Sequence, residues 1–494
     1  MTRRALITRP SGGGHFRERP AYGANHQVWI LGLLGAAAST WVASLVPDLV
    51  SGLLVFSTCS VLWIAVVMSM VDGFRPVAAV FSVFTFAWLG VAPAFQLAAG
   101  MVAWRDTFVL TDVARVRVAL AMTAVAALAF LVGMIVGRRR YQEPRPARTV
   151  TVRGAVLAVL CVALIGLAPV AIRANGGFGA LFTTRQQLQS IRAGMGQTID
   201  ALGGPAYALT RVLPGALAVT VTILAVWWIK ENWRGVARMR MGAVAALVVG
   251  VAGMVLFVNP FTNTRFAAAA AFGSVLWAIT RPRSRASATF WVSTLLFVCL
   301  LVYPLANAFR FDDERKVKSG VEAFLTADFD GFQQVINTIS YVEAHGHTLG
   351  NQILSAAGFI IPRSIWVTKA EPASYAIAQN AGYSFVNLSL PIHAELYLEF
   401  GWLGVVLGML ALGLVAARLD DGWLTGVLGI AGLLTPYVAF AMLGVMRGPI
   451  GAQIPVWGTV VALLLIGVRR RRLSDDSRPP NFSTKPAGRA HRFL

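Results

Sequence analysis

The chain has 494 residues, of which 56% are hydrophobic and only 13% are charged, yet its formal net charge is +21. Soluble domains are about 45–50% apolar and about 25% charged, so this composition excludes a water-soluble globular protein. It also excludes a disordered chain, because disordered chains are poor in hydrophobic residues.

Apolar stretches of membrane-spanning length recur along the chain. A bilayer core about 30 Å thick is crossed by about 20 apolar residues in a helix. Twelve stretches fit this requirement, the eighth of them being short: 28–46, 49–71, 77–99, 116–136, 154–172, 206–229, 241–259, 265–280, 287–306, 394–416, 423–446 and 450–468. The sequence therefore predicts an all-α, polytopic integral membrane protein with about twelve transmembrane helices.

The charges predict the orientation of these helices. With the N-terminal tail inside and each helix reversing direction, the inside segments hold 28 basic and 8 acidic residues, and the rest of the chain holds 15 and 14. Cytoplasmic loops carry such an excess of Lys and Arg. We therefore expect a protein of the cytoplasmic (inner) membrane with both basic tails, 1–27 and 469–494, in the cytoplasm. Its inside Arg residues should contact anionic lipids rather than nucleic acid.

The sequence predicts neither a cofactor nor a metal. Cys59, Cys161 and Cys299 all fall within predicted spans, where they read as small buried hydrophobes rather than as a disulfide framework or a metal cluster. No Walker loop, dinucleotide-binding fingerprint or HExxH motif occurs. Coupling to bound ATP is therefore not expected.

One long extracytoplasmic loop, 307–393, separates the first nine predicted spans (28–306) from the last three (394–468). Its length indicates a functional role. Ser319 and Glu322 form a capping-box pattern that opens an apolar stripe with spacings of three and four, which predicts an amphipathic helix of about 25 residues. We place Asp328 and Asp330 on or beside its wetter side, and expect a helix that lies on the membrane or caps the bundle rather than a catalytic one.

A short apolar piece, 351–363, follows in the same loop. It is too short to span the bilayer. We expect it to dip into the outer leaflet and return, which places Arg363 close to the lipid headgroups.

Five outside arginines are candidates to bind an anion. Arg presents a planar fork of donors that suits phosphate oxygens, and outside Arg is not favoured by topology. The five lie in outside loops or at the ends of predicted spans: Arg185, Arg192, Arg265, Arg363 and Arg447. The alternative is that they snorkel or pair with Asp200, Asp312 or Asp313. For the set, we favour an anionic lipid headgroup.

Acidic residues open the tenth predicted span. Glu395 and Glu399 are four residues apart and so share one helix face, and His393 precedes them. A carboxylate at the bilayer interface suits a general base. The alternative is a helix N-terminus that favours acids in its first turn.

These residues resemble a known family, the Wzy-type O-antigen polymerases, which are oligosaccharide repeat-unit polymerases similar to the GT-C membrane glycosyltransferases. The resemblance rests on five pieces of sequence: Gly176-Gly177 leading into Thr184-Arg185, Asn259-Pro260 before Arg265, the run from Phe359 to Trp366, the run from His393 to Gly404, and Arg447-Gly448.

The resemblance implies an activity. Such enzymes join polyprenyl-diphosphate-linked oligosaccharide units into a cell-surface polysaccharide on the outer face of the cytoplasmic membrane, without a metal. Glu395 or His393 would be the base, and the five arginines would hold the diphosphate. The implied partners are this lipid-linked oligosaccharide, membrane lipids, a chain-length regulator and a flippase.

Two other functions stay open at this stage. A ligase would move a finished glycan from the same lipid carrier, and it shares the predicted topology. A polysaccharide or lipid transporter would carry charged or broken helices near the middle of the membrane and internal repeats, neither of which is evident here.

Overall fold

The computed structural model describes residues 26–104, 108–138, 148–194, 205–232, 237–303, 320–383, 385–386, 388–425 and 429–472. Helices occupy all twelve predicted stretches in this part of the chain. Eight helical segments there are long and apolar enough to cross a membrane, and four further apolar helices are shorter. The prediction of an all-α protein with many apolar helices is confirmed, and the count of twelve spans stays a prediction.

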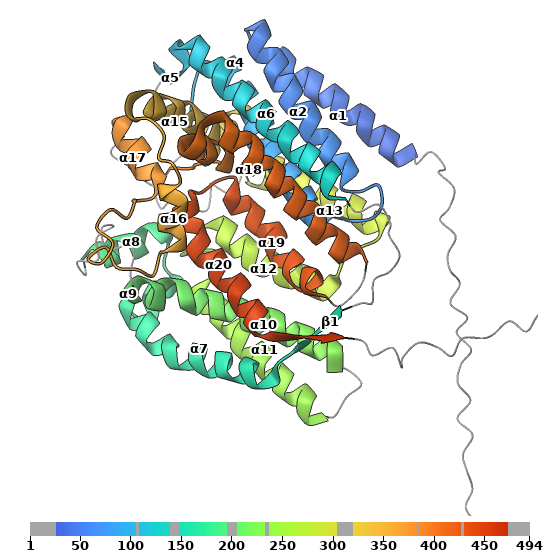
Figure 1. Ribbon diagram of the computed structural model, residues 1–494, viewed down its shortest axis with the longest axis vertical. Helices are drawn as coiled ribbons and strands as arrows, with labels where there is room; N and C mark the ends of the chain where they lie inside the picture. The colour runs from blue at the N-terminus through green and yellow to red at the C-terminus, as the bar shows by residue number, and fades with distance from the viewer. Residues whose placement is uncertain are drawn as a thin grey trace, which may run out of the picture.

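The long helices run in chain order through the whole described structure (Figure 1). They are α1 His26–Ser44, α2 Leu49–Met68, α6 Val113–Gly137, α7 Gly154–Ala174, α10 Leu213–Asn232, α11 Ala237–Phe257, α12 Arg265–Thr280, α13 Arg285–Phe297, α18 Ile392–Leu424, α19 Ile430–Val445 and α20 Ile450–Ile466. The helix of the eleventh predicted span, α19, begins at Ile430 rather than at residue 423, because α18 continues to Leu424.

Shorter elements connect and extend these helices. They are α3 Pro76–Thr85, η1 Phe86–Val91, α4 Ala92–Ala99, α5 Phe108–Thr111, η2 Gly179–Phe182, α8 Arg185–Gly194, α9 Pro205–Tyr207, η4 Ala208–Val212, η5 Val298–Val302, η7 Gly320–Leu325, η8 Ala327–Phe329, α15 Gly331–His345, α16 Asn351–Ala357 and α17 Ala373–Asn380. The continuous segment α3–η1–α4 is the central helix of the bundle, since the apolar window within it is completely buried.

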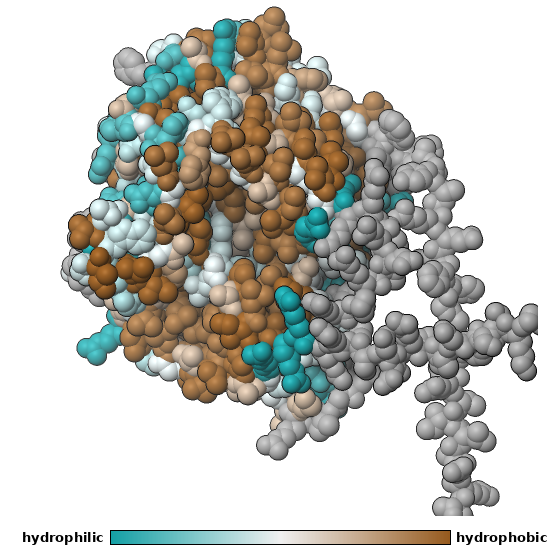
Figure 2. Space-filling model, viewed as in Figure 1, coloured by the Kyte–Doolittle hydropathy of each residue, from teal (hydrophilic) through white to brown (hydrophobic). Residues whose placement is uncertain are grey.

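The flanks of the bundle are apolar. Large hydrophobic side chains such as Leu33 (70% exposed), Val162 (70%) and Val248 (63%) point outward from α1, α7 and α11. Figure 2 shows hydrophobic residues over much of the visible face. Exposed apolar patches of this extent suit contact with lipid rather than with water.

Close packing between α6 and α18 depends on glycine. A Cβ added to Gly133 would lie 2.1 Å from the carbonyl oxygen of Leu410, and one added to Gly413 would lie 2.1 Å from that of Phe130. Any side chain at either position would push the helices apart, as expected where small residues line a membrane helix interface.

The connections gather at two ends of the bundle. At one end, β1 (Arg148–Val152) pairs antiparallel with β2 (Val468–Arg472), a small sheet that the sequence analysis did not predict. Near this end the Asp420 carboxylate accepts the N–H groups of Val77 and Ala78. The small sheet lies on the right in Figure 1, while α15, α16 and α17 lie on the left. Both strands come from segments that the charge pattern assigns to the cytoplasm, and their side of the membrane stays a prediction.

The predicted 25-residue helix in the large loop is wrong at its N-terminal half. The 3₁₀ turns η7 and η8 come first, and α15 begins only at Gly331; Ser319 lies outside the described residues. Side chains of the central helix segment α3–η1–α4 donate hydrogen bonds to the main-chain carbonyls that would accept backbone N–H groups in a longer helix. The Gln96 amide donates to the carbonyls of Phe324 and Phe329, and the Trp88 indole donates to that of Asp328.

The predicted position of the two acids on the wetter side is also wrong. Asp328 is 4% exposed and Asp330 is 1% exposed. The N-terminal part of α15, from Gly331 to Ile339, is buried as well. Of the two expected placements, this helix therefore caps the bundle rather than lying on an open surface.

A break divides α18. Phe400 and Gly401 have non-helical dihedral angles, and Gly401 has a φ of +63°, which favours glycine. The carbonyls of Leu398 and Glu399 accept the N–H groups of Thr348 and Leu349 from the large loop, and so are drawn out of the helical ladder. His393, Glu395 and Glu399 therefore lie on a short helical segment before the break.

Candidate functional site

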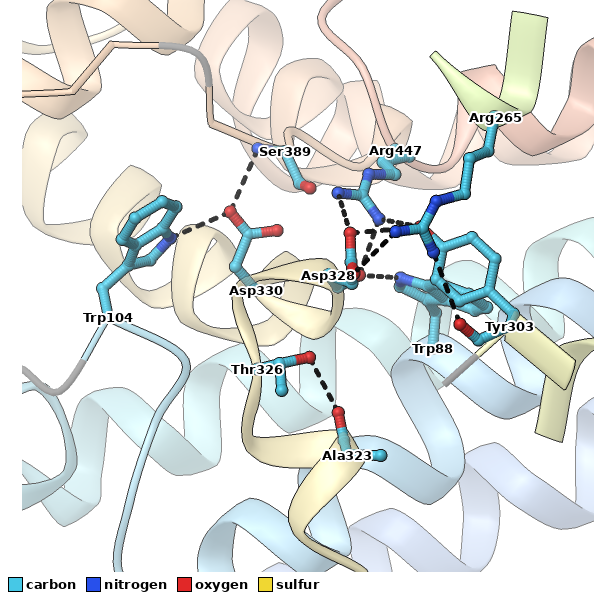
Figure 3. Close-up of polar contacts among 10 residues, drawn as sticks. All are labelled: Trp88, Trp104, Arg265, Tyr303, Ala323, Thr326, Asp328, Asp330, Ser389 and Arg447. Atoms are coloured by element: carbon cyan, nitrogen blue, oxygen red, sulfur yellow. Dashed lines mark hydrogen bonds and ion pairs between the residues drawn. The ribbon is translucent and has the colours of Figure 1, made fainter. Parts of the chain in front are cut away.

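Two of the predicted arginines meet at one buried acid (Figure 3). The Nη1 group of Arg447 donates to the main-chain oxygen of Asp328 at 2.7 Å, and its Nη2 group lies 3.3 Å from Oδ1 of Asp328. Arg265 also approaches this carboxylate, with Nη2 at 3.8 Å from Oδ2 of Asp328. The arginines are 182 residues apart in sequence, and a single carboxylate bridges them.

Tyr303 joins the same cluster. Its hydroxyl accepts a hydrogen bond from Nη1 of Arg447 at 2.6 Å, and its main-chain oxygen accepts one from Arg265 at 3.4 Å. The cluster therefore holds two guanidinium groups, one carboxylate and one phenol.

Local structure presents each arginine at a helix end. Arg265 is the first residue of α12, whose N-cap is Thr264: the Thr264 hydroxyl accepts the N–H of Ala267. The preceding turn is fixed by Asn259, whose side-chain oxygen accepts the N–H groups of Phe261 and Thr262. The Asn-Pro sequence before Arg265 thus sets the direction in which the helix starts.

Arg447 lies in the tight turn between α19 and α20. Its main-chain oxygen accepts the N–H of Leu390 at 2.9 Å, which ties the turn to the end of the large loop. Its guanidinium is only 19% exposed at the side chain. Burial works against its charge, but the neighbouring Tyr303, Asp328 and Asp330 together raise the pKa of Arg447 above its ordinary value.

Aromatic rings surround the cluster. Trp88 stacks on Phe329 at 4.3 Å and meets Tyr303 edge-on at 4.6 Å. The guanidinium of Arg265 lies 5.1 Å from the centre of the Tyr303 ring, and that of Arg447 lies 4.8 Å from the Phe266 ring. Such cation–π contacts stabilise positive charge in a site with little water.

A second acid, Asp330, lies beside this cluster (Figure 3). Its Oδ2 accepts hydrogen bonds from the Trp104 indole at 3.0 Å and from the N–H of Ser389 at 3.2 Å. Its Oδ1 is buried and has no hydrogen-bond partner among the described residues. Burial raises the pKa of Asp330, and the positive charge of Arg447 offsets part of this increase.

Glu395 touches the turn that carries Arg447. The carboxylate is fully buried, and its Oε2 accepts the N–H of Ile450, the first residue of α20, at 2.7 Å. The other oxygen, Oε1, is buried without a hydrogen-bond partner in the described part of the chain. One oxygen thus holds the helix N-terminus three residues after Arg447, and the other is available for a further donor.

The two neighbours of Glu395 face other groups. Nε2 of His393 lies 3.3 Å from the Thr123 hydroxyl on α6. Glu399 accepts hydrogen bonds from the Thr348 hydroxyl and from the N–H groups of Gly350 and Ile353. Glu399 therefore fixes the 348–353 turn, which is a structural role.

The other two arginines of the set whose side chains the structure describes contact different groups. Arg192 donates to the side-chain oxygen of Asn175 at 2.6 Å, and Arg363 donates to the carbonyls of Lys369 and Ala370. The side chain of Arg185 lies outside the described residues. So do the proposed acidic partners Asp200, Asp312 and Asp313.

The sequence analysis missed Asp328, Tyr303 and Trp88 as members of the site. The available signal was a pair of acids, Asp328 and Asp330, inside the largely apolar run from Phe324 to Phe332. Such an acid suggests a buried partner. Tyr303 and Trp88 carry no comparable signal, because aromatic residues are common at the ends and interfaces of apolar helices.

Comparisons with known proteins return no relative: no family model, no curated protein and no solved structure matches this chain. Among the described residues, no group of three or more His, Cys, Asp or Glu side chains is placed to hold a metal ion.

Proposed function

We propose that this protein is a membrane glycosyltransferase that polymerises polyprenyl-diphosphate-linked oligosaccharide units at the outer face of the cytoplasmic membrane. One observation carries the proposal: Arg265 and Arg447, both singled out as outside arginines, converge on Asp328 at one end of an apolar helical bundle. The family resemblance of the flanking residues supports the same function.

The charge of the cluster suits a diphosphate. Two guanidinium groups face the Asp328 carboxylate, so these three groups carry a net positive charge. Burial raises the pKa of the neighbouring Asp330 and so disfavours a second negative charge there. The side chains of Arg265 and Arg447 are 22% and 19% exposed, whereas that of Asp328 is 6% exposed. The cations therefore present the accessible part of the cluster, and Asp328 positions them from behind. Preorganised donors of this kind stabilise the charge that develops on a leaving group.

The proposed reaction is a glycosyl transfer. The hydroxyl oxygen of the incoming unit attacks the anomeric carbon of the growing chain and forms the new glycosidic bond. The bond from that carbon to the diphosphate oxygen breaks, and the electron pair leaves on the diphosphate beside Arg265 and Arg447. Glu395 accepts the hydroxyl proton through its unpartnered oxygen.

Access to Glu395 requires movement. The carboxylate is fully enclosed, and its contact with Ile450 lies at the start of α20. A displacement of the 446–450 turn would expose Glu395 and would move Arg447 at the same time. Diphosphate binding at Arg447 would then be coupled to exposure of the proposed base. His393 is the weaker candidate, because its ring faces Thr123 instead of this turn.

The test is the size distribution of lipid-linked glycan in a strain that lacks this protein. Single unpolymerised units on the outer face support the polymerase. Full-length chains that remain unattached indicate the ligase, and units retained on the inner face indicate the flippase; either result overturns the proposal.

A further inference from the structure

A second group of cations lies in and beside the turn between α12 and α13, near the start of α3. Lys230 comes from the C-terminal end of α10, and Arg281 and Arg283 come from the turn itself. Lys230 donates to the carbonyls of Ala278 and Ile279 at 2.7 and 2.6 Å, and these two residues lie in the last turn of α12. Lys230 therefore has an evident role as a helix C-cap.

The two arginines each lie over an indole ring. The guanidinium carbon of Arg281 is 4.3 Å from the centre of Trp227, and that of Arg283 is 5.2 Å from the centre of Trp423. Trp227 comes from α10 and Trp423 from α18, so the turn lies between these helices. One face of each guanidinium is thus covered, while both side chains keep partial exposure.

The backbone of this turn is fixed from three directions. The N–H of Arg281 donates to the carbonyl of Trp277, the indole of Trp423 donates to the carbonyl of Pro282, and the N–H of Phe74 donates to the carbonyl of Arg283. Arg281 has a φ of +47°, a conformation that glycine or asparagine adopts more easily. The guanidinium groups are therefore held in defined places by a rigid turn.

Among the described residues, no carboxylate forms an ion pair with either of these two arginines. In the described structure neither guanidinium forms an ion pair, and the Nε atoms of both are buried without a hydrogen-bond partner. Glu231 is nearby, but its oxygens accept hydrogen bonds from the Trp227 indole and the N–H of Val152. Burial and then the charge of Arg283 lower the pKa of Arg281 to about 10, against a smaller opposing effect of Glu231. An anion between the two guanidinium groups would relieve this repulsion.

We propose that Arg281 and Arg283 bind the phosphate group of an anionic lipid headgroup at this end of the bundle. Arginine donors match phosphate oxygens, and basic pockets between membrane helices bind anionic headgroups on the cytoplasmic side. Trp227 and Trp423 suit the same boundary, because indole rings favour the membrane–water interface. The positive-inside pattern predicts that this turn lies in the cytoplasmic leaflet. The site is independent of the proposed glycosyl transfer.

The experiment uses the full-length protein purified in a neutral detergent. Its thermal unfolding midpoint is measured with added dioleoyl-phosphatidylglycerol, dioleoyl-phosphatidylcholine or inorganic phosphate. We expect phosphatidylglycerol to raise the midpoint by roughly 2 °C or more, and phosphatidylcholine to leave it unchanged. An equal rise with inorganic phosphate would support the same anion site with a free anion as its occupant. No rise with either phosphate source overturns the proposal.

Matched variants locate the effect. Arg281→Gln and Arg283→Gln should each remove most of the rise, while Arg285→Gln should keep it, because Arg285 is an exposed arginine at the start of α13 in the same turn region. Two arginine variants are used so that one result stands if the other protein fails to fold. An equal loss of the rise in Arg285→Gln would show non-specific attraction and overturn the assignment.

Discussion

The guanidinium of Arg447 contacts both the backbone and the side chain of Asp328. Nη1 donates to the main-chain oxygen of Asp328 at 2.7 Å, and Nη2 lies 3.3 Å from its carboxylate. The backbone contact takes a carbonyl that a continuous helix would have used, so it helps to end η8 before α15. The side-chain contact places a negative charge between Arg447 and Arg265. One acid thus shapes the loop and orients the proposed diphosphate site.

Removal of either converging arginine should stop chain growth. We expect Arg265→Ala and Arg447→Ala each to lower polymerisation by roughly 100-fold, since loss of one preorganised donor to developing charge costs about that much. The measurement is the length of lipid-linked glycan in strains that produce each variant. Arg115→Ala is the control, because Arg115 pairs with Glu343 at an exposed position away from the cluster. Equal shortening in the control would show a general effect of losing an arginine.

Glu395 and Glu399 should respond differently to the same conservative change. Glu395→Gln keeps an oxygen for the N–H of Ile450, so we expect a folded protein without chain elongation. Glu399→Gln places an amide among three hydrogen-bond donors, Thr348, Gly350 and Ile353. We expect it to lower stability by about 1–3 kcal/mol. Thermal unfolding and glycan length are measured for both. Normal elongation by Glu395→Gln would remove that residue from the reaction.

The Asp328–Arg447 pair should show energetic coupling. Because Asp328 is buried, Asp328→Asn or Arg447→Met alone removes one partner of a buried ion pair, which costs up to about 3–5 kcal/mol. Arg265 still faces Asp328 and Asp330 still lies near Arg447, so part of each charge stays compensated in the single variants. The double variant should therefore lose less than the sum of the two single losses, as read from thermal unfolding midpoints. The exposed ion pair of Arg115 and Glu343 serves for comparison, with the variants Arg115→Met and Glu343→Gln. Its coupling free energy should be at most about 1 kcal/mol. Strict additivity at Asp328 and Arg447 would contradict a direct interaction.

Stability should depend on pH through Asp330. Its pKa is raised by burial, so the folded protein holds this proton more tightly than the unfolded chain does. The resulting stabilisation is complete at pH values below the ordinary pKa that the group has in the unfolded chain, and it is lost as the pH rises through the raised pKa of the folded protein. Asp330→Asn can still accept from Trp104 and Ser389, and should flatten this dependence without loss of stability at neutral pH. The unfolding midpoint is followed from about pH 4 to 8 in both proteins, and identical profiles would rule out this contribution.

Helical spans and candidate arginines could be predicted from local sequence, because long apolar runs and charges at their ends carry the signal. The convergence of Arg265 and Arg447 could not, since it depends on packing across 182 residues. The break before α15 could not be predicted for the same reason. The apolar spacing continues from Phe324 to Phe332, as in a continuous helix. The side chains that interrupt the helix, Trp88 and Gln96, come from more than 200 residues away in the sequence.

The small sheet was also beyond local reasoning. The Thr-Val-Thr-Val run of β1 suits a strand, but its partner β2 is an arginine run that the sequence presents only as positive charge. Glu395 shows the opposite case. Its position at a helix start was predictable, yet its hydrogen bond to Ile450 on another helix was not.

Direct binding of a polyprenyl diphosphate tests the central claim most closely. The purified wild-type protein, Arg265→Ala, Arg447→Ala and Arg115→Ala are titrated with undecaprenyl diphosphate in detergent, and the dissociation constants are compared. We predict that the two cluster variants bind at least about tenfold more weakly than wild type, since each loses a charge-assisted contact of roughly 1.5–3 kcal/mol, and that Arg115→Ala binds as wild type. Equal affinity in all four proteins would contradict a diphosphate site at Arg265 and Arg447.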